Sequence, residues 1–145
     1  MNRLPRIISW LSRLILLGAT IIFTVIGLRF INDPRPAAAA IGIIVSSPLG
    51  ATTLRIGLGG FPVALALITF ACLISRSRHQ TGIWFVLTVM ATAIAVRLIG
   101  VAEDGIVPDS VRLFVPEGLM SMLCIVTLFL QQRRRHDRST VVAEG

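Results

Sequence analysis

Four apolar stretches, each long enough to cross a membrane, constrain the fold of this 145-residue chain more than any other feature. They run from Leu14 to Ile31, from Arg55 to Ser75, from Gly82 to Val101 and from Leu113 to Gln131. An α-helix rises about 1.5 Å per residue, so about 20 residues cross a hydrocarbon core of roughly 30 Å. The stretches do not alternate polar and apolar residues as the strands of a membrane barrel do. The sequence therefore predicts an all-α polytopic membrane protein, in which a single domain (residues 1–145) forms a four-helix transmembrane bundle with a short basic tail at 132–145.

The composition argues against a soluble globular protein, because 54% of the residues are hydrophobic and only 14% are charged. The net charge of +7 comes from 14 arginines against seven acids, and the arginines gather at the ends of the apolar stretches. That placement is typical of residues that set orientation in a membrane. The basic clusters lack the interleaved aromatic residues that stack on bases, so we expect no nucleic-acid partner.

The distribution of arginines predicts the orientation. Four spans place the N-terminus, the middle loop and the C-terminus on one side of the membrane. That side carries nine of the arginines: Arg3, Arg6, Arg13, Arg76, Arg78, Arg133, Arg134, Arg135 and Arg138. The other side carries five arginines and most of the acids. The positive-inside rule then predicts an inner-membrane protein with both termini in the cytoplasm.

The connections contain recognisable helix boundaries. Residues 32–36 form a helix-stopping turn, and the apolar patch at 37–45 is too short to cross, so we expect it to lie along the interface or to cap the bundle. Ser47 followed by Pro48 is typical of a helix start and predicts a second helix of about 28 residues. The polar end of the tail is expected to be disordered.

Charged residues close to the span ends are the most informative for function. Arg97 lies four residues before Val101 and Glu117 four residues after Leu113, so both sit roughly 6 Å inside their span ends. Consecutive antiparallel helices bring them to similar depth on one side of the membrane, where charges normally face the bundle and pair. The predicted polar cluster consists of Arg55, Arg97 and Glu117, with Asp104 or Glu103 above it.

Two interpretations of this cluster stay open. A permanently charged guanidinium holds a carboxylate ionised and can also grip an anionic group, which favours a ligand site. Alternatively, Pro116 followed by Glu117 is typical of the first turn of a helix, and arginines near span ends can simply extend their head groups to the interface. A purely structural ion pair then accounts for the same residues.

Glycines and small residues predict a close helix contact near the start of the second span. The helix-packing residues are Gly57, Gly59, Gly60 and Ala64. Gly60 and Ala64 are spaced as a small-xxx-small pair, and Ala91 and Ala95 on the third span repeat that spacing as a matching face. Pro62 removes a backbone hydrogen bond and is expected to kink the helix there.

Motifs for enzyme and cofactor chemistry are missing from the sequence. It contains no HExxH, Walker, GxSxG or CxxC motif, and the histidines, His79 and His136, lie outside the spans. Cys72 and Cys124 fall inside apolar runs, where cysteine behaves as a small hydrophobe. We therefore predict no catalytic, cofactor-binding or metal residues, and an enzyme is disfavoured.

The pattern of charged and small residues resembles a known family. Arg55 before Gly59 and Gly60, Arg97 with Gly100 and Asp104-Gly105, and Glu117 early in the last span look like a bacterial family of small four-span proteins. That family is described only as a domain of unknown function and is similar in layout to the DoxX-like membrane proteins. The resemblance covers roughly residues 28–131. It implies a compact four-helix membrane bundle and brings no substrate or catalytic residue.

These features favour a binding or scaffolding bundle with a small polar pocket at the extracytoplasmic face. The alternative is a small transporter or channel that works as an oligomer, because four spans alone rarely enclose a polar path. A membrane-embedded redox subunit is a third interpretation. The expected partners are the lipid bilayer together with a second copy, another membrane protein, or a lipid or small-molecule ligand.

Overall fold

The computed structural model describes residues 4–105 and 108–143, and all regular structure in that part of the chain is helical. The elements are α1 (Leu4–Asn32), α2 (Pro34–Ala39), α3 (Pro48–Leu54), the π-helix η1 (Arg55–Gly60), α4 (Phe61–Ile74), the 3₁₀-helix η2 (Arg76–Arg78), α5 (His79–Asp104) and α6 (Pro108–Ala143). Four helical segments in the described residues are long and apolar enough to cross a membrane: Ile8–Asn32, Pro48–Ile74, Arg76–Glu103 and Phe114–Arg133. The all-α fold with four spans is confirmed.

The second span begins where the local sequence predicts. Pro48 is the first residue of α3, and the Ser47 hydroxyl accepts a hydrogen bond from the Gly50 N–H at 3.0 Å. This bond satisfies one of the N–H groups that lack a partner in the first turn of a helix. Helices α3, η1 and α4 then follow one another without a break, and the span is 27 residues long.

The connection between the first two spans covers one end of the bundle. Helix α1 ends at Asn32, and Pro34 begins the short helix α2. Ala37 and Ala38 of α2 are buried with Phe30 in a small apolar cluster, to which Val45, Leu54 and Leu58 also pack. The apolar patch therefore contributes to a cap over α1 and α3.

The last helix differs from the sequence-based expectation at both ends. The interpretation of Pro116 as part of the first helical turn is wrong, because Pro116 lies inside α6, which begins at Pro108. Pro108 takes the first helical position, which proline favours. At the other end α6 continues to Ala143, so the expectation that the polar end of the tail, after Arg138, is disordered is wrong as far as Ala143. Residues 119–143 contain no glycine or proline, and glutamine and arginine are good helix formers.

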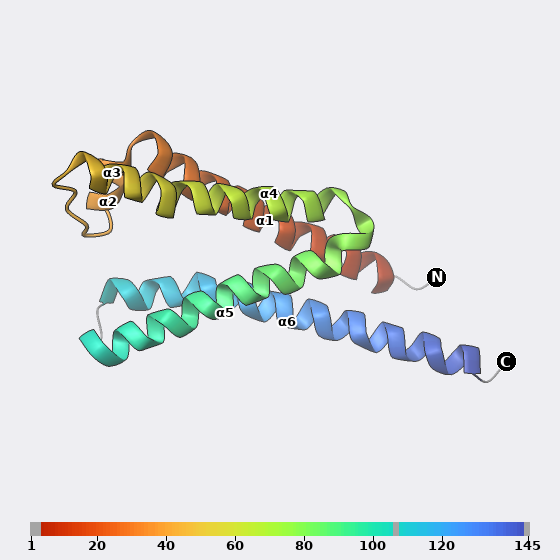
Figure 1. Cartoon of the computed structure of the whole chain (residues 1–145). Coiled ribbons are helices and arrows are strands. Elements are labelled where there is room, and N and C mark those ends of the chain that lie inside the picture. The colour runs from red at the N-terminus through yellow and green to blue at the C-terminus, as the bar shows by residue number, and fades with distance from the viewer. Residues whose placement is uncertain (1–3, 106–107, 144–145) are drawn as a thin grey trace.

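The long helices form two antiparallel pairs (Figure 1). The first hairpin consists of α1 against η1 and α4, and the second consists of α5 against α6. Both chain ends and the α4–α5 turn lie at one end of the molecule, which we call the terminal end. The opposite end, the loop end, holds α2 and α3 and the points where α5 ends and α6 begins.

Among the residues that the structure describes, the core shared by the two hairpins lies in the half nearer the terminal end. The core residues are Ile15, Leu16, Ala19 and Phe23 of α1, Ala66 and Cys72 of α4, Ile83 and Val86 of α5, and Cys124 and Leu128 of α6. The two hairpins approach closely at Gly82, because an added Cβ there would come within 2.7 Å of both Leu16 and Cys72. Towards the loop end the ribbons of the two hairpins diverge, and α5 and α6 expose apolar side chains such as Ile99 and Val115 (Figure 1).

Candidate polar site in the second hairpin

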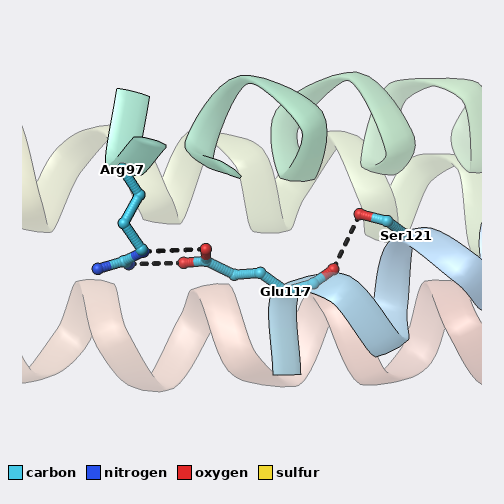
Figure 2. Close-up of polar contacts among 3 residues, drawn as sticks. All are labelled: Arg97, Glu117 and Ser121. Carbon is cyan, nitrogen blue, oxygen red and sulfur yellow. Dashed lines mark hydrogen bonds and ion pairs between the residues drawn. The ribbon is translucent and has the colours of Figure 1, made fainter. Parts of the chain in front are cut away.

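Arg97 of α5 and Glu117 of α6 form a two-bond ion pair (Figure 2). The Arg97 Nε donates to Glu117 Oε2 at 3.0 Å, and Nη2 donates to Oε1 at 2.6 Å. The Arg97 guanidinium also lies 6.0 Å from the centre of the Phe114 ring. Two parallel bonds between a planar guanidinium and a carboxylate fix the relative geometry as well as the charge. The pair therefore sets how α5 and α6 face each other near the loop end.

Helix periodicity places the pair on the core-facing sides of α5 and α6. Arg97 follows the buried Val86 by eleven residues, about three turns, and Glu117 precedes the buried Cys124 by seven, about two turns. The side chains of Arg97 and Glu117 are nevertheless 25% and 17% exposed. They remain partly exposed because the first hairpin, which covers these sides at the core, has diverged at the level of the pair.

The charge balance of the pair suits its position within the spans. A single charge at the centre of a membrane helix costs about 2.5–3.5 kcal/mol on insertion scales, so charges there normally pair. Arg97 uses two of the five N–H groups of arginine, which leaves three that Glu117 does not take. Each carboxylate oxygen of Glu117 likewise has a lone pair beyond the bond to Arg97. The pair is thus neutral as a whole but retains capacity for further hydrogen bonds.

The polar groups next to Glu117 in the helix bond locally. The Ser121 hydroxyl donates to the Glu117 backbone carbonyl at 2.8 Å, one turn back along α6 (Figure 2). This bond satisfies a hydroxyl within a membrane span without a partner from another helix. Because Pro116 lies inside α6, Glu117 is not in the first helical turn. The favourable interaction of an acid with a helix start therefore does not explain its position.

Arg55 does not join this pair but has a different partner. Its side chain is exposed, and its Nε donates to the carbonyl of Ile31 at 3.1 Å, in the last turn of α1. The last carbonyls of a helix lack intrahelical donors, so Arg55 acts as a cap on α1. Of the other predicted members, Glu103 is exposed and the side chain of Asp104 lies outside the described residues.

Gly59 makes the close helix contact, and its neighbour is the first span. An added Cβ at Gly59 would lie 2.7 Å from Ile31 Cγ1 and 3.4 Å from the Gly27 carbonyl. Conversely, a Cβ added at Gly27 would lie 2.8 Å from the Gly59 carbonyl oxygen. An added Cβ at Gly57 would meet nothing within 4 Å, whereas Gly60 and Ala64 are exposed. The contact therefore joins α1 to η1, and the third span does not take part in it.

The backbone at the predicted kink adopts a π-helical turn. The Phe61 N–H donates to the carbonyl of Ile56, five residues earlier, and Pro62 follows with no N–H to donate. Single π turns inside α-helices are rare and are often found at functional sites. Here the turn includes Gly59, so it belongs to the segment that contacts α1.

Two polar contacts between helices were not predicted from the sequence. The hydroxyls of Thr20 in α1 and Thr69 in α4 are 2.9 Å apart, and the Gln131 amide of α6 donates to Ser12 of α1 at 3.0 Å. The sequence does show polar residues inside the spans, and such groups need hydrogen-bond partners in lipid. It does not show which residues pair, because that depends on which helices are neighbours.

Neither the side chains near this site nor a similarity to known proteins assigns a reaction to it. Within residues 4–105 and 108–143, no three His, Cys, Asp or Glu side chains gather as a metal site would need. Cys72 and Cys124 are buried and unbonded. Comparisons with protein-family models, with curated proteins and with solved structures found no match to this chain. Function is therefore inferred from the geometry of the polar site.

Proposed function

We propose that this protein is a bacterial inner-membrane bundle that binds another membrane component at the Arg97–Glu117 pair. Both termini lie in the cytoplasm, so the pair sits near the extracytoplasmic face. The protein acts as a binding or scaffolding unit and not as an enzyme. A layout similar to that of DoxX-like proteins stays a prediction.

One observation carries the proposal: a two-bond ion pair within the spans that is partly exposed on a core-facing side. A purely structural pair would be expected to be covered by protein, because lipid tails cannot bond the remaining N–H groups and lone pairs. A bound component with polar groups at this depth would satisfy them. The surrounding exposed side chains, including Val96, Leu98 and Leu119, are apolar and suit a ligand that itself lies in the membrane.

Native mass spectrometry of the protein released from lipid nanodiscs tests the proposal. The wild type is compared with the double variant Arg97→Gln, Glu117→Gln, which removes both charges and keeps a polar side chain at each position. Arg55→Gln is the matched control, because it removes an arginine at the same end that lies outside the pair. We expect the wild type and the control to retain a bound species whose occupancy falls about tenfold in the double variant. A wild type that carries nothing, or a double variant that carries the same species equally well, would contradict the proposal.

The proposed orientation has its own test. Fusion of a fluorescent protein to the C-terminus is expected to give fluorescent cells, whereas a periplasmic phosphatase at the same place is expected to be inactive. The excess of arginine at the terminal end supports this orientation. An active phosphatase fusion would reverse the orientation and place the Arg97–Glu117 pair on the cytoplasmic side.

A further inference from the structure

The ion pair presents one cation and one anion side by side, each with unused hydrogen-bonding capacity. Three N–H groups of Arg97 are not used by Glu117, and one guanidinium nitrogen points away from the carboxylate in Figure 2. Glu117 can accept further bonds at both oxygens. A ligand that complements the whole pair must bring an acceptor anion for Arg97 and a donor cation for Glu117. A simple anion meets only the first requirement. It would also be repelled by the Glu117 carboxylate beside Arg97.

The position of the pair restricts the size and nature of that ligand. Arg97 lies about 16 Å along α5 from Val86, where the two hairpins are packed together. The core-facing side of α5 is thus uncovered over only a few turns, and the exposed side chains nearby are apolar. Arg97 is also roughly 10 Å from the end of α5, close to the level at which acyl chains give way to headgroups. These features favour a single lipid, with its headgroup at the pair and its chains along α5 and α6.

We propose that the Arg97–Glu117 pair binds the zwitterionic headgroup of an aminophospholipid of the phosphatidylethanolamine class. The phosphate accepts hydrogen bonds from the free N–H groups of Arg97, and the primary ammonium donates to Glu117. Arg97 and Glu117 keep their mutual bonds, so the headgroup extends the pair into a network of alternating charges. This inference rests on the proposed function and specifies its ligand.

Two related phospholipid headgroups differ from ethanolamine in ways that separate the role of Glu117 from that of Arg97. Phosphatidylcholine carries the same phosphate, but its quaternary ammonium has no N–H to donate to Glu117. Phosphatidylglycerol also carries the phosphate, but it has no cation and is left with an unbalanced negative charge beside a carboxylate. Selectivity for the ethanolamine headgroup over choline therefore reports on Glu117, whereas retention of any phospholipid at the site reports on Arg97.

The test is a competition in nanodiscs that contain equal parts of the three lipids with identical acyl chains. Native mass spectrometry then identifies the lipids that stay with the full-length protein after release. We expect phosphatidylethanolamine to be enriched about tenfold over phosphatidylcholine among the retained lipids, as one additional hydrogen bond to a charged group implies. Equal retention of ethanolamine and choline lipids by the wild type would overturn the inference without the need for any variant.

Two single variants separate the roles of the two side chains. Glu117→Gln is expected to retain a phospholipid but to lose the preference for ethanolamine over choline, and Arg97→Gln is expected to lose the retained lipid. Arg55→Gln, with its contact to Ile31, should behave as the wild type. A circular dichroism spectrum confirms that each variant is folded, and Glu117→Asp provides a second acidic variant that should keep the preference.

The outcomes distinguish this inference from the proposed function. If the wild type retains a different species, such as a second copy of the chain or phosphatidylglycerol, and loses it in the Arg97→Gln, Glu117→Gln variant, the pair is a binding site but its ligand is not an aminophospholipid. If the wild type retains nothing, both the proposed function and this inference are wrong.

Discussion

Gly27 and Gly59 allow the backbones of α1 and η1 to approach each other. A Cβ added at Gly27 would lie 2.6 Å from Val63 Cγ2 and 2.8 Å from the Gly59 carbonyl. The second neighbour is backbone, which cannot rotate away as a flexible side chain can. Small residues at such crossings bring membrane helices into van der Waals contact, which is the main attraction available to them in lipid.

The Gly27→Ala substitution is therefore expected to destabilise the protein. The added methyl group forces α1 and η1 apart, at a cost of about 1–3 kcal/mol. Gly57→Ala is the matched control, because an added Cβ there meets nothing within 4 Å and alanine favours the helix. Thermal unfolding in detergent should show a lower midpoint for Gly27→Ala and an unchanged or higher midpoint for Gly57→Ala. Equal midpoints for the two variants would mean that the contact does not exist.

Polar contacts add to packing at the level of helix pairs. Thr69 is fully buried, and its hydroxyl bonds both to its own helix and to Thr20 of α1. Within a span such hydroxyls can be satisfied locally, so the interhelical bond adds only modestly to stability. It nevertheless fixes the register between α1 and α4, because the two threonines meet at one relative height only.

Thr69→Val is expected to lower the free energy of unfolding by about 0.6 kcal/mol, the average of interhelical bonds in membranes. The change keeps the shape of the side chain and removes its hydroxyl. Thr88→Val is the control, because Thr88 is exposed and donates only to Trp84 in its own helix. Denaturation in mixed micelles measures both variants. A loss in Thr88→Val as large as that in Thr69→Val would show that the contact between α1 and α4 is not the cause.

At the scale of the whole molecule, the described residues join the two hairpins through a core near the terminal end. Ile83 is completely buried there, whereas Ile99, more than four turns later on the same helix, is 56% exposed. Stability should therefore be concentrated in the terminal half of the bundle. The loop end is held within each hairpin by separate contacts, namely the Arg97–Glu117 pair in the second and the Gly27–Gly59 contact in the first.

Ile83→Ala and Ile99→Ala test this uneven distribution with the same chemical change. Ile83→Ala leaves a cavity between the hairpins and is expected to cost about 2–4 kcal/mol. Ile99→Ala removes side-chain atoms that face lipid and is expected to be close to neutral. Unfolding free energies in nanodiscs or mixed micelles give the comparison. Equal costs for the two substitutions would indicate that the hairpins are also packed together at the loop end.

The sequence predicts the level of residues along the bundle well and their lateral neighbours poorly. Apolar length and helix rise suffice to place Arg97 and Glu117 at the same level on consecutive helices, and the structure shows them bonded. The same reasoning places Arg55 at that level, but depth does not say which helix it faces, and Arg55 contacts the end of α1 instead. Gly27 was missed for the same reason: its role depends on α1 being the neighbour of η1.

The proposed binding site depends on the Arg97–Glu117 pair, and a double-mutant cycle tests that pair most directly. Unfolding free energies are measured for Arg97→Gln, for Glu117→Gln and for the double variant in the same membrane mimic. Because each single variant leaves a charge without its partner, we expect a coupling energy of about 1–3 kcal/mol between the two positions. Additive effects, with a coupling below about 0.3 kcal/mol, would contradict the pair and the binding site built on it.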